Sequence, residues 1–128
     1  MTETESSPIA IGAQGRPLND QNCVTLRGRV SAEPVSRELP SGDQIVSVRV
    51  VLARERTAMT RGSRQPSDWV ECVAWASRAR RSVASWRPGD TVEIEGALRR
   101  RYYRAGGVPT TRVEVEVLKA RSLRRVGA

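Results

Sequence analysis

The chain has 128 residues and a formal net charge of +8, and it contains neither histidine nor phenylalanine. This length fits one domain, and the basic balance predicts a polyanionic partner, with nucleic acid first and an anionic membrane surface second. The lack of histidine excludes imidazole catalysis and His-ligated metal sites, and no apolar run is long enough to span a membrane.

Three segments are expected. Residues 1–21 are predicted to form a disordered arm, because they are rich in small and polar residues and lack apolar periodicity beyond Ile9 and Ile11. Residues 22–118 are predicted to fold, and residues 119–128 to form a basic tail that frays. The N-terminus has no apolar stretch of the secretory type, so a cytoplasmic, nucleoid-associated location is expected.

Alternation of apolar and polar residues predicts the first two long strands. Val24, Leu26 and Val30 share one face, with Gly28 in phase at a position where a small closed barrel needs a bend. The second strand, residues 45–53, points Val46, Val48 and Val50 one way and Arg49 the other. The turn residues at 39–43 can join it to the short run before them.

A long polar loop follows at residues 54–67. It carries four arginines and no apolar pattern, and a loop of this length in a compact domain is usually functional or disordered. It is interpreted as a basic funnel for phosphates, formed by Arg54, Arg56, Arg61 and Arg64.

The third strand, residues 69–75, begins and ends with tryptophan. Since Trp69 and Trp75 are six residues apart, both leave the same face. Most tryptophans in small domains lie in the core. Here the opposite face already offers Val70, Cys72 and Ala74 as an aliphatic core, which favours a solvent- or ligand-facing role for the two rings.

Residues 77–86 change to helical spacing, with Ser77 as the expected N-cap. Ala79, Val83 and Trp86 form the apolar stripe of this helix. Trp86 is therefore expected to close one end of the barrel rather than to contact a ligand.

The fourth strand, residues 91–103, has one apolar and one basic parity. The inward parity holds Val92, Ile94, Gly96 and Leu98, with the glycine at a second bend. Tyr102 continues this parity and is expected in the core or at the rim. The outward parity carries Arg99, Arg101 and Tyr103. After a hairpin loop, the last strand at 111–117 is expected to turn Val113, Val115 and Val117 inward.

This order of elements predicts an all-β, five-stranded Greek-key barrel of OB type, with one short helix between the third and fourth long strands. Periodicity alone also allows another small barrel. Rings beside arginines on exposed strand faces indicate binding of single-stranded nucleic acid, because bases stack on rings while arginines follow the phosphates. The candidate residues are Trp69, Trp75, Tyr103, Arg49, Arg99 and Arg101, together with the four loop arginines.

Signs of catalysis are missing. No P-loop and no nucleophile motif occurs, and no cofactor or metal is expected. Four carboxylates spaced by two could imitate a metal site, but they are interpreted as the solvated side of half-buried strands: Glu93, Glu95, Glu114 and Glu116. Cys23 and Cys72 are interpreted as buried free thiols rather than as a disulfide.

Several segments together form a recognisable pattern. They are residues 22–30 followed by Glu33 and Pro34, then 39–42, 68–75 and 87–99. In this pattern the sequence resembles bacterial single-stranded DNA-binding proteins over about residues 22–118. The resemblance implies an OB-fold that assembles as a homotetramer and wraps single-stranded DNA in replication, recombination or repair.

By motif position, the resemblance also places the stacking aromatics of that family on Trp69, Trp75 and Tyr103. A fourth ring, expected after the second strand, has no counterpart in residues 54–58, where arginine is expected to compensate. The family's acidic C-terminal tip is replaced by the basic residues 121–128, so recruitment of replication and repair enzymes through an acidic tail is not expected.

Three other functions remain open from the sequence. One is an RNA-binding OB module of the cold-shock kind. Another is a primosomal adaptor that acts mainly through protein contacts. The most distant is a metal-dependent nuclease that uses the strand carboxylates.

Overall fold

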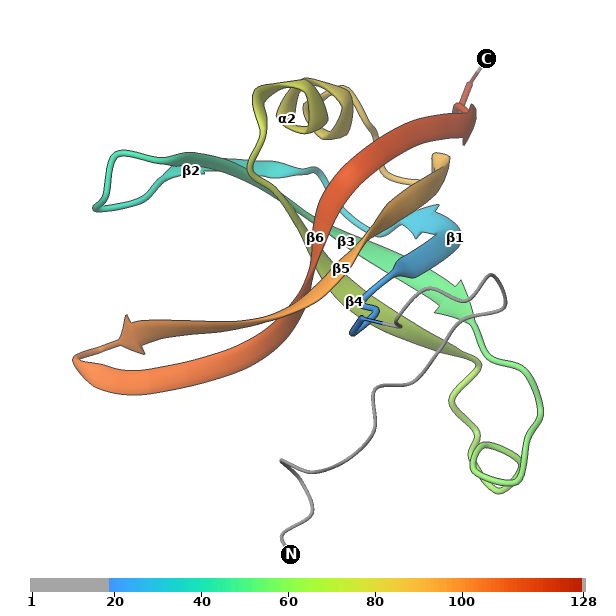
Figure 1. Ribbon diagram of the computed structural model, residues 1–128. Coiled ribbons are helices and arrows are strands. Elements are labelled where there is room, and N and C mark those ends of the chain that lie inside the picture. Colours follow the sequence, from blue (N-terminus) through green and yellow to red (C-terminus); the bar gives the residue numbers. More distant parts are fainter. Residues whose placement is uncertain (1–18, 128) are drawn as a thin grey trace, which may run out of the picture.

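The computed structural model describes residues 19–127, so the predicted N-terminal segment, residues 1–21, lies almost entirely outside the described residues (Figure 1). The elements run in the order β1 (Val24–Val30), β2 (Val35–Glu38), β3 (Gln44–Ala53), β4 (Ser67–Ala74), α2 (Ser77–Ala84), β5 (Thr91–Ala105) and β6 (Val108–Arg124). The short helix stands where the sequence placed it, between the third and fourth long strands.

The strands form one sheet in the order β1-β5-β6-β4-β3-β2, which closes into a barrel because β1 also pairs with β3. The pairing of β4 with β6 is parallel, whereas the other pairings are antiparallel. This is the predicted Greek-key barrel of OB type, but with six strands instead of five, because the short β2 pairs with β3. The short β2 forms a hairpin with β3 through the expected turn at 39–43.

Two glycines allow the close approach of strands that closure requires. A Cβ atom at Gly96 would overlap the carbonyl oxygen of Glu116, and the register of β5 against β6 shifts between Glu95 and Gly96. A Cβ at Gly28 would overlap the carbonyl oxygen of Val51, where β1 passes from β5 to β3. Both predicted bends therefore lie at points where only glycine fits.

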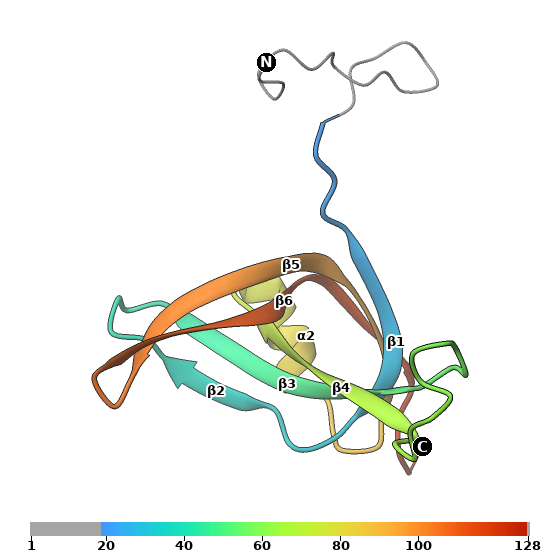
Figure 2. The ribbon, with the colours of Figure 1, turned by 90° about the horizontal axis from the view of Figure 1, so that it is seen from below.

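The core is aliphatic and is closed at one end by the helix. Val, Ile and Ala side chains from β1, β3, β4, β5 and β6 pack with Cys72, Val83 and Trp86. Trp86 is 2% exposed, which confirms its predicted place, and Figure 2 shows α2 behind the ring of strands. The cap position is Ala76 without a side-chain cap, so the prediction of Ser77 as N-cap was wrong: Ser77 is already the first helical residue.

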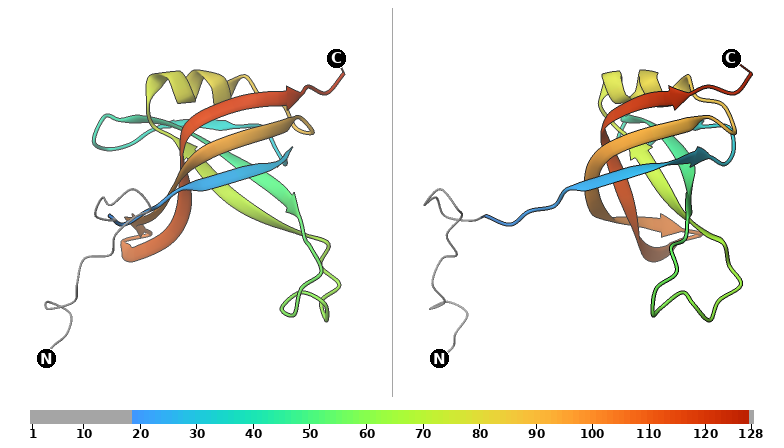
Figure 3. Two further views of the ribbon diagram at one scale, coloured as in Figure 1. Left: turned by 45° about the vertical axis from the view of Figure 1, so that its right-hand side comes forward. Right: turned by 90° about the vertical axis from the view of Figure 1, so that its right-hand side faces the viewer.

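The far ends of β5 and β6 project from the barrel as a two-stranded arm, residues 99–113, visible in Figure 1 and Figure 3. Alternation continues along the arm, but no core lies beneath it. Leu98, Tyr102 and Val113 are consequently 49%, 77% and 50% exposed. The predictions that Tyr102 lies in the core or at the rim and that Val113 points inward were wrong for this reason.

The last strand is longer than predicted. β6 continues to Arg124, and its residues 119–124 pair with the first half of β5, with Glu95 opposite Lys119 and Thr91 opposite Arg124. Ala120 packs against the core. The expectation that the chain frays from Lys119 was therefore wrong up to Arg124, because β5 needs a partner along this half of its length.

Both cysteines are free thiols, as predicted. Cys72 is fully buried, and burial raises the pKa of its thiol to about 12, with Glu71 and Glu114 adding to the shift. Cys23 precedes β1 and is exposed, so its predicted burial was wrong.

Among residues 19–127 no helix is both long enough and apolar enough to cross a membrane.

Candidate nucleic-acid interface

Trp69 lies on the outer face of β4 under an arginine. Its side chain is 56% exposed, and the guanidinium carbon of Arg49 lies 3.9 Å from the centroid of its ring. Arg49 on β3 stands directly opposite Glu71 in the register, and its Nε lies 3.7 Å from a carboxylate oxygen of Glu71. Cross-strand pairing thus sets a cation–π contact on the outside of the barrel.

Trp75 follows the last residue of β4 and lines a hollow beneath the arm. This hollow of about 350 Å³ is lined by Val73, Trp75, Arg99, Arg100, Arg101, Glu114 and Glu116. The guanidinium carbon of Arg101 lies 5.9 Å from the centroid of the Trp75 ring. The structure therefore brings together three of the predicted site residues, Trp75 from the end of β4 and Arg99 and Arg101 from β5.

Tyr103, on the arm, is half-buried and pairs with an arginine that the sequence reasoning missed. The guanidinium carbon of Arg112 lies 5.4 Å from the centroid of the Tyr103 ring. Arg112 is opposite Arg101 in the β5–β6 register. The pairing of the predicted hairpin across residues 104–110 was the signal that could have found it.

Carboxylates hold these arginines. Glu114 is 2% exposed; its Oε2 lies 2.7 Å from Nε of Arg112, and its Oε1 lies 3.6 Å from Nε of Arg101. The hydrogen bond from Arg112 to Glu114 raises the pKa of Arg112 above its ordinary value, and Glu71 adds to the shift. Glu116 accepts a hydrogen bond of 3.0 Å from Nε of Arg99.

The prediction that the strand carboxylates are solvated was wrong for Glu93 and Glu114. Glu93 is 9% exposed, and its two oxygens each lie 2.8 Å from a guanidinium nitrogen, one of Arg27 and one of Arg121. These hydrogen bonds, the one from Arg27 first, lower the pKa of Glu93. Arginines from neighbouring strands make burial of these acids possible, since a buried charge must be paired.

One guanidinium nitrogen of Arg101, Nη1, is buried without a hydrogen-bond partner among the described residues. A buried donor without a partner costs roughly 1–3 kcal/mol relative to a satisfied one.

The loop between β3 and β4 leaves the barrel on the side away from α2 (Figure 1). Nε of Arg54 donates a hydrogen bond of 2.9 Å to Asp68, so this arginine is bound to the fold. Arg56, Arg61 and Arg64 are exposed, and within residues 19–127 they form no ion pair. The structure does not bring these three loop arginines to any of the rings.

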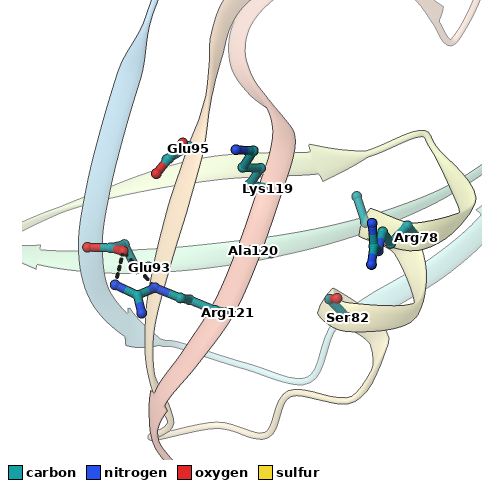
Figure 4. A pocket seen from close by; sticks show the side chains of 8 residues that line it. Arg78, Ser82, Glu93, Glu95, Lys119, Ala120 and Arg121 are labelled. Atoms are coloured by element: carbon teal, nitrogen blue, oxygen red, sulfur yellow. Dashed lines mark hydrogen bonds and ion pairs between the residues drawn. The ribbon is translucent and has the colours of Figure 1, made fainter.

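A second hollow, of about 330 Å³, lies between α2 and the other half of β5 and β6 (Figure 4). Its charged side chains include Arg78, Glu95 and Lys119, and no aromatic residue lines it. Figure 4 shows Arg121 bonded to Glu93 in its wall. It offers no ring on which a base could stack, so it is not part of the candidate interface. In the part of the chain that the structure describes, no three Cys, Asp or Glu side chains gather as a metal site.

The protein is a closed OB barrel whose outer surface carries aromatic rings beside arginines. The chain belongs to the single-strand binding protein family, whose model matches residues 21–123. It is 28% identical over 82 residues to single-stranded DNA-binding protein A of Bacillus subtilis (strain 168), which covers 64% of this chain and 46% of that protein. It is 27% identical over 82 residues to single-stranded DNA-binding protein 2 of Listeria innocua serovar 6a, which covers 64% of this chain and 50% of that protein.

These matches span about half the length of the two curated relatives. Among solved structures, the chain is similar to one described as Plasmodium falciparum SSB complex with ssDNA. The TM-score is 0.64 at 21% sequence identity, over 84% of this chain and 96% of that one. This likeness shows a shared fold.

Proposed function

We propose that this protein binds single-stranded DNA without sequence preference and protects it during replication, recombination and repair. The observation that carries the proposal is the set of three rings on the outer face of the barrel and arm, Trp69, Trp75 and Tyr103. Each has a guanidinium group 3.9–5.9 Å from its centroid. Membership of the single-strand binding protein family supports the same function.

In this proposal the rings stack on bases and the arginines neutralise phosphates. Stacking of a base on an aromatic side chain contributes roughly 1–3 kcal/mol and is tolerant of sequence, because every base has a π-face. Arg49 lies beside Trp69, Arg101 lies beside Trp75, and Arg99 lines the same hollow as Trp75, so backbone and bases can be bound together at each ring. The three free loop arginines extend the positive surface beyond the barrel.

The protein acts in this proposal as a non-catalytic coat on DNA at the nucleoid, and the homotetramer expected from the family resemblance is part of the proposal. Support for assembly comes from apolar side chains that one copy leaves exposed on the arm and at its base, Leu98, Tyr102 and Val113. Light scattering should give four times the chain mass of 14.1 kDa. A single-chain mass at micromolar concentration would contradict the tetramer without touching DNA binding.

The test of DNA binding is a titration of the protein with poly(dT), followed by intrinsic tryptophan fluorescence. Quenching is expected to saturate, since Trp69 and Trp75 would stack on bases. Mixed-sequence single strands of equal length should compete within a few fold, and duplex DNA should compete poorly. The Trp69→Ala/Trp75→Ala double variant is the control, because it keeps the buried Trp86. Equal quenching in that variant, or preference for duplex, would contradict the proposal.

A further inference from the structure

One buried carboxylate, Glu114 on β6, links two of the three ring sites. It lies in the wall of the hollow beneath the arm and is 2% exposed. Each of its oxygens is next to a different arginine: Oε2 lies 2.7 Å from Nε of Arg112, and Oε1 lies 3.6 Å from Nε of Arg101. Both arginine side chains are longer than the acid and more exposed: the side chain of Arg112 is 42% exposed and that of Arg101 is 21% exposed.

Each of those two arginines in turn lies next to a different ring. Arg101 is beside Trp75, and Arg112 is beside Tyr103. A free arginine side chain has many rotamers, and fixing it costs conformational entropy when it binds. A carboxylate that holds the Nε end of the guanidinium fixes the side chain before a ligand binds, so that less entropy is lost on binding.

Charge alone argues against an acid at this position. A carboxylate in a surface that receives phosphates repels them, and its burial carries a desolvation cost that only well-placed partners offset. Resting on the proposed function, we propose that Glu114 is a positioning residue for single-stranded DNA. It holds Arg101 and Arg112 over Trp75 and Tyr103 before the DNA arrives, and this gain in preorganisation exceeds the repulsion it adds.

Glu116 provides a matched control two residues away on the same strand and in the same hollow. It is 25% exposed and bonds Arg99 alone, and among the described residues Arg99 lies over no ring. Glu114→Gln and Glu116→Gln therefore make the same chemical change and the same change in net charge. They differ in whether the acid holds arginines that lie beside rings.

The experiment measures the Kd of the full chain for a dT oligonucleotide, well below the melting temperature of each variant. Glu116→Gln should bind about twofold tighter, as expected when one unit charge at roughly 8 Å from a phosphate is removed in water. Glu114→Gln should instead bind about fivefold weaker, because Arg101 and Arg112 would then lose side-chain entropy on binding, and this cost exceeds the repulsion that is removed. Opposite signs for the two variants support the proposal.

Equal tightening by both variants would overturn it, because Glu114 would then be only a negative charge. A lower Tm with an unchanged Kd for Glu114→Gln would also overturn it, because the acid would then serve the fold alone. If Glu114→Gln does not fold, Glu114→Asp replaces it. Its net charge is unchanged and its shorter carboxylate cannot reach both arginines, so weaker binding supports the proposal and wild-type affinity overturns it. Wild-type protein that binds no dT oligonucleotide would refute the proposed function itself, a result distinct from all of these.

Discussion

Replacement of Arg56, Arg61 and Arg64 together by glutamine tests whether the loop between β3 and β4 binds phosphates. All three side chains are exposed, and in the described range they form no ion pair. Arg54 is left in place because it bonds Asp68 at 2.9 Å. The triple variant therefore removes three positive charges from the surface and breaks no ion pair of the fold.

The size of the effect follows from counterion release. For single strands, the slope of log affinity against log salt is about −0.7 per neutralised phosphate. If each loop arginine neutralises one phosphate, the variant's slope should be less steep by about 2. Between 50 and 200 mM salt, the advantage of the wild type over the variant should then shrink by about twentyfold.

Fluorescence titrations with a dT oligonucleotide at four or five salt concentrations measure this slope. A second triple variant, Arg78→Gln/Arg81→Gln/Arg87→Gln, makes the same change in net charge in and just after α2, on the other side of the barrel (Figure 1). It should keep nearly the wild-type slope. An unchanged slope in the loop variant, or an equal change in both variants, would refute the assignment of the loop to the DNA path.

Three further outcomes are expected. Trp69→Ala should weaken binding of a dT oligonucleotide by about 1–3 kcal/mol, whereas Trp69→Phe should keep most of the affinity; calorimetric titration measures both, and equal losses would exclude stacking at this ring. Trp86→Ala should lower the free energy of unfolding by about 3–5 kcal/mol, because a ring that is 2% exposed leaves a cavity, and urea denaturation checks this. Asp90 accepts hydrogen bonds from the backbone N–H groups of Val126 and Arg87, which lower its pKa. Its contribution to stability is therefore complete above the unfolded-state pKa of about 4 and is lost as pH falls through the lower folded-state pKa. The Tm of Asp90→Asn should be below that of the wild type at pH 7 and should approach it in acid; a gap that persists at acid pH would contradict the role of the carboxylate.

The barrel could be predicted from the sequence because its signals are local. A side-chain period of two placed Cys72 and Ala74 in the core and Trp69 outside it. The change to helical spacing at Ser77, with Trp86 on the apolar stripe, located the helix and its closing ring. These inferences need only the neighbours along the chain, which the sequence supplies directly.

The arm could not be predicted in the same way. Alternation says which side chains share a face, but it does not say where the core beneath that face ends. Leu98 and Tyr102 keep the inward parity of Val92, yet the barrel stops before them. The burial of Glu114 was missed for a related reason. It depends on Arg101 and Arg112, which reach it through the β5–β6 pairing, and a count along one strand cannot show a partner from another.

The arginines beside the rings also determine how a base can approach. The guanidinium of Arg49 lies 3.9 Å from the centroid of Trp69, which is contact distance, so one face of that ring is occupied in the free protein. Stacking on Trp69 therefore uses the opposite face or displaces Arg49 from its pair with Glu71. The guanidinium groups over Trp75 and Tyr103 lie farther from the ring centroids, at 5.9 and 5.4 Å, and are held by Glu114. Of the three rings, only Trp75 lines the hollow beneath the arm. Because its arginine stands farther off than Arg49 does from Trp69, we expect a strand of DNA to bind first at Trp75 and to require a larger side-chain rearrangement at Trp69.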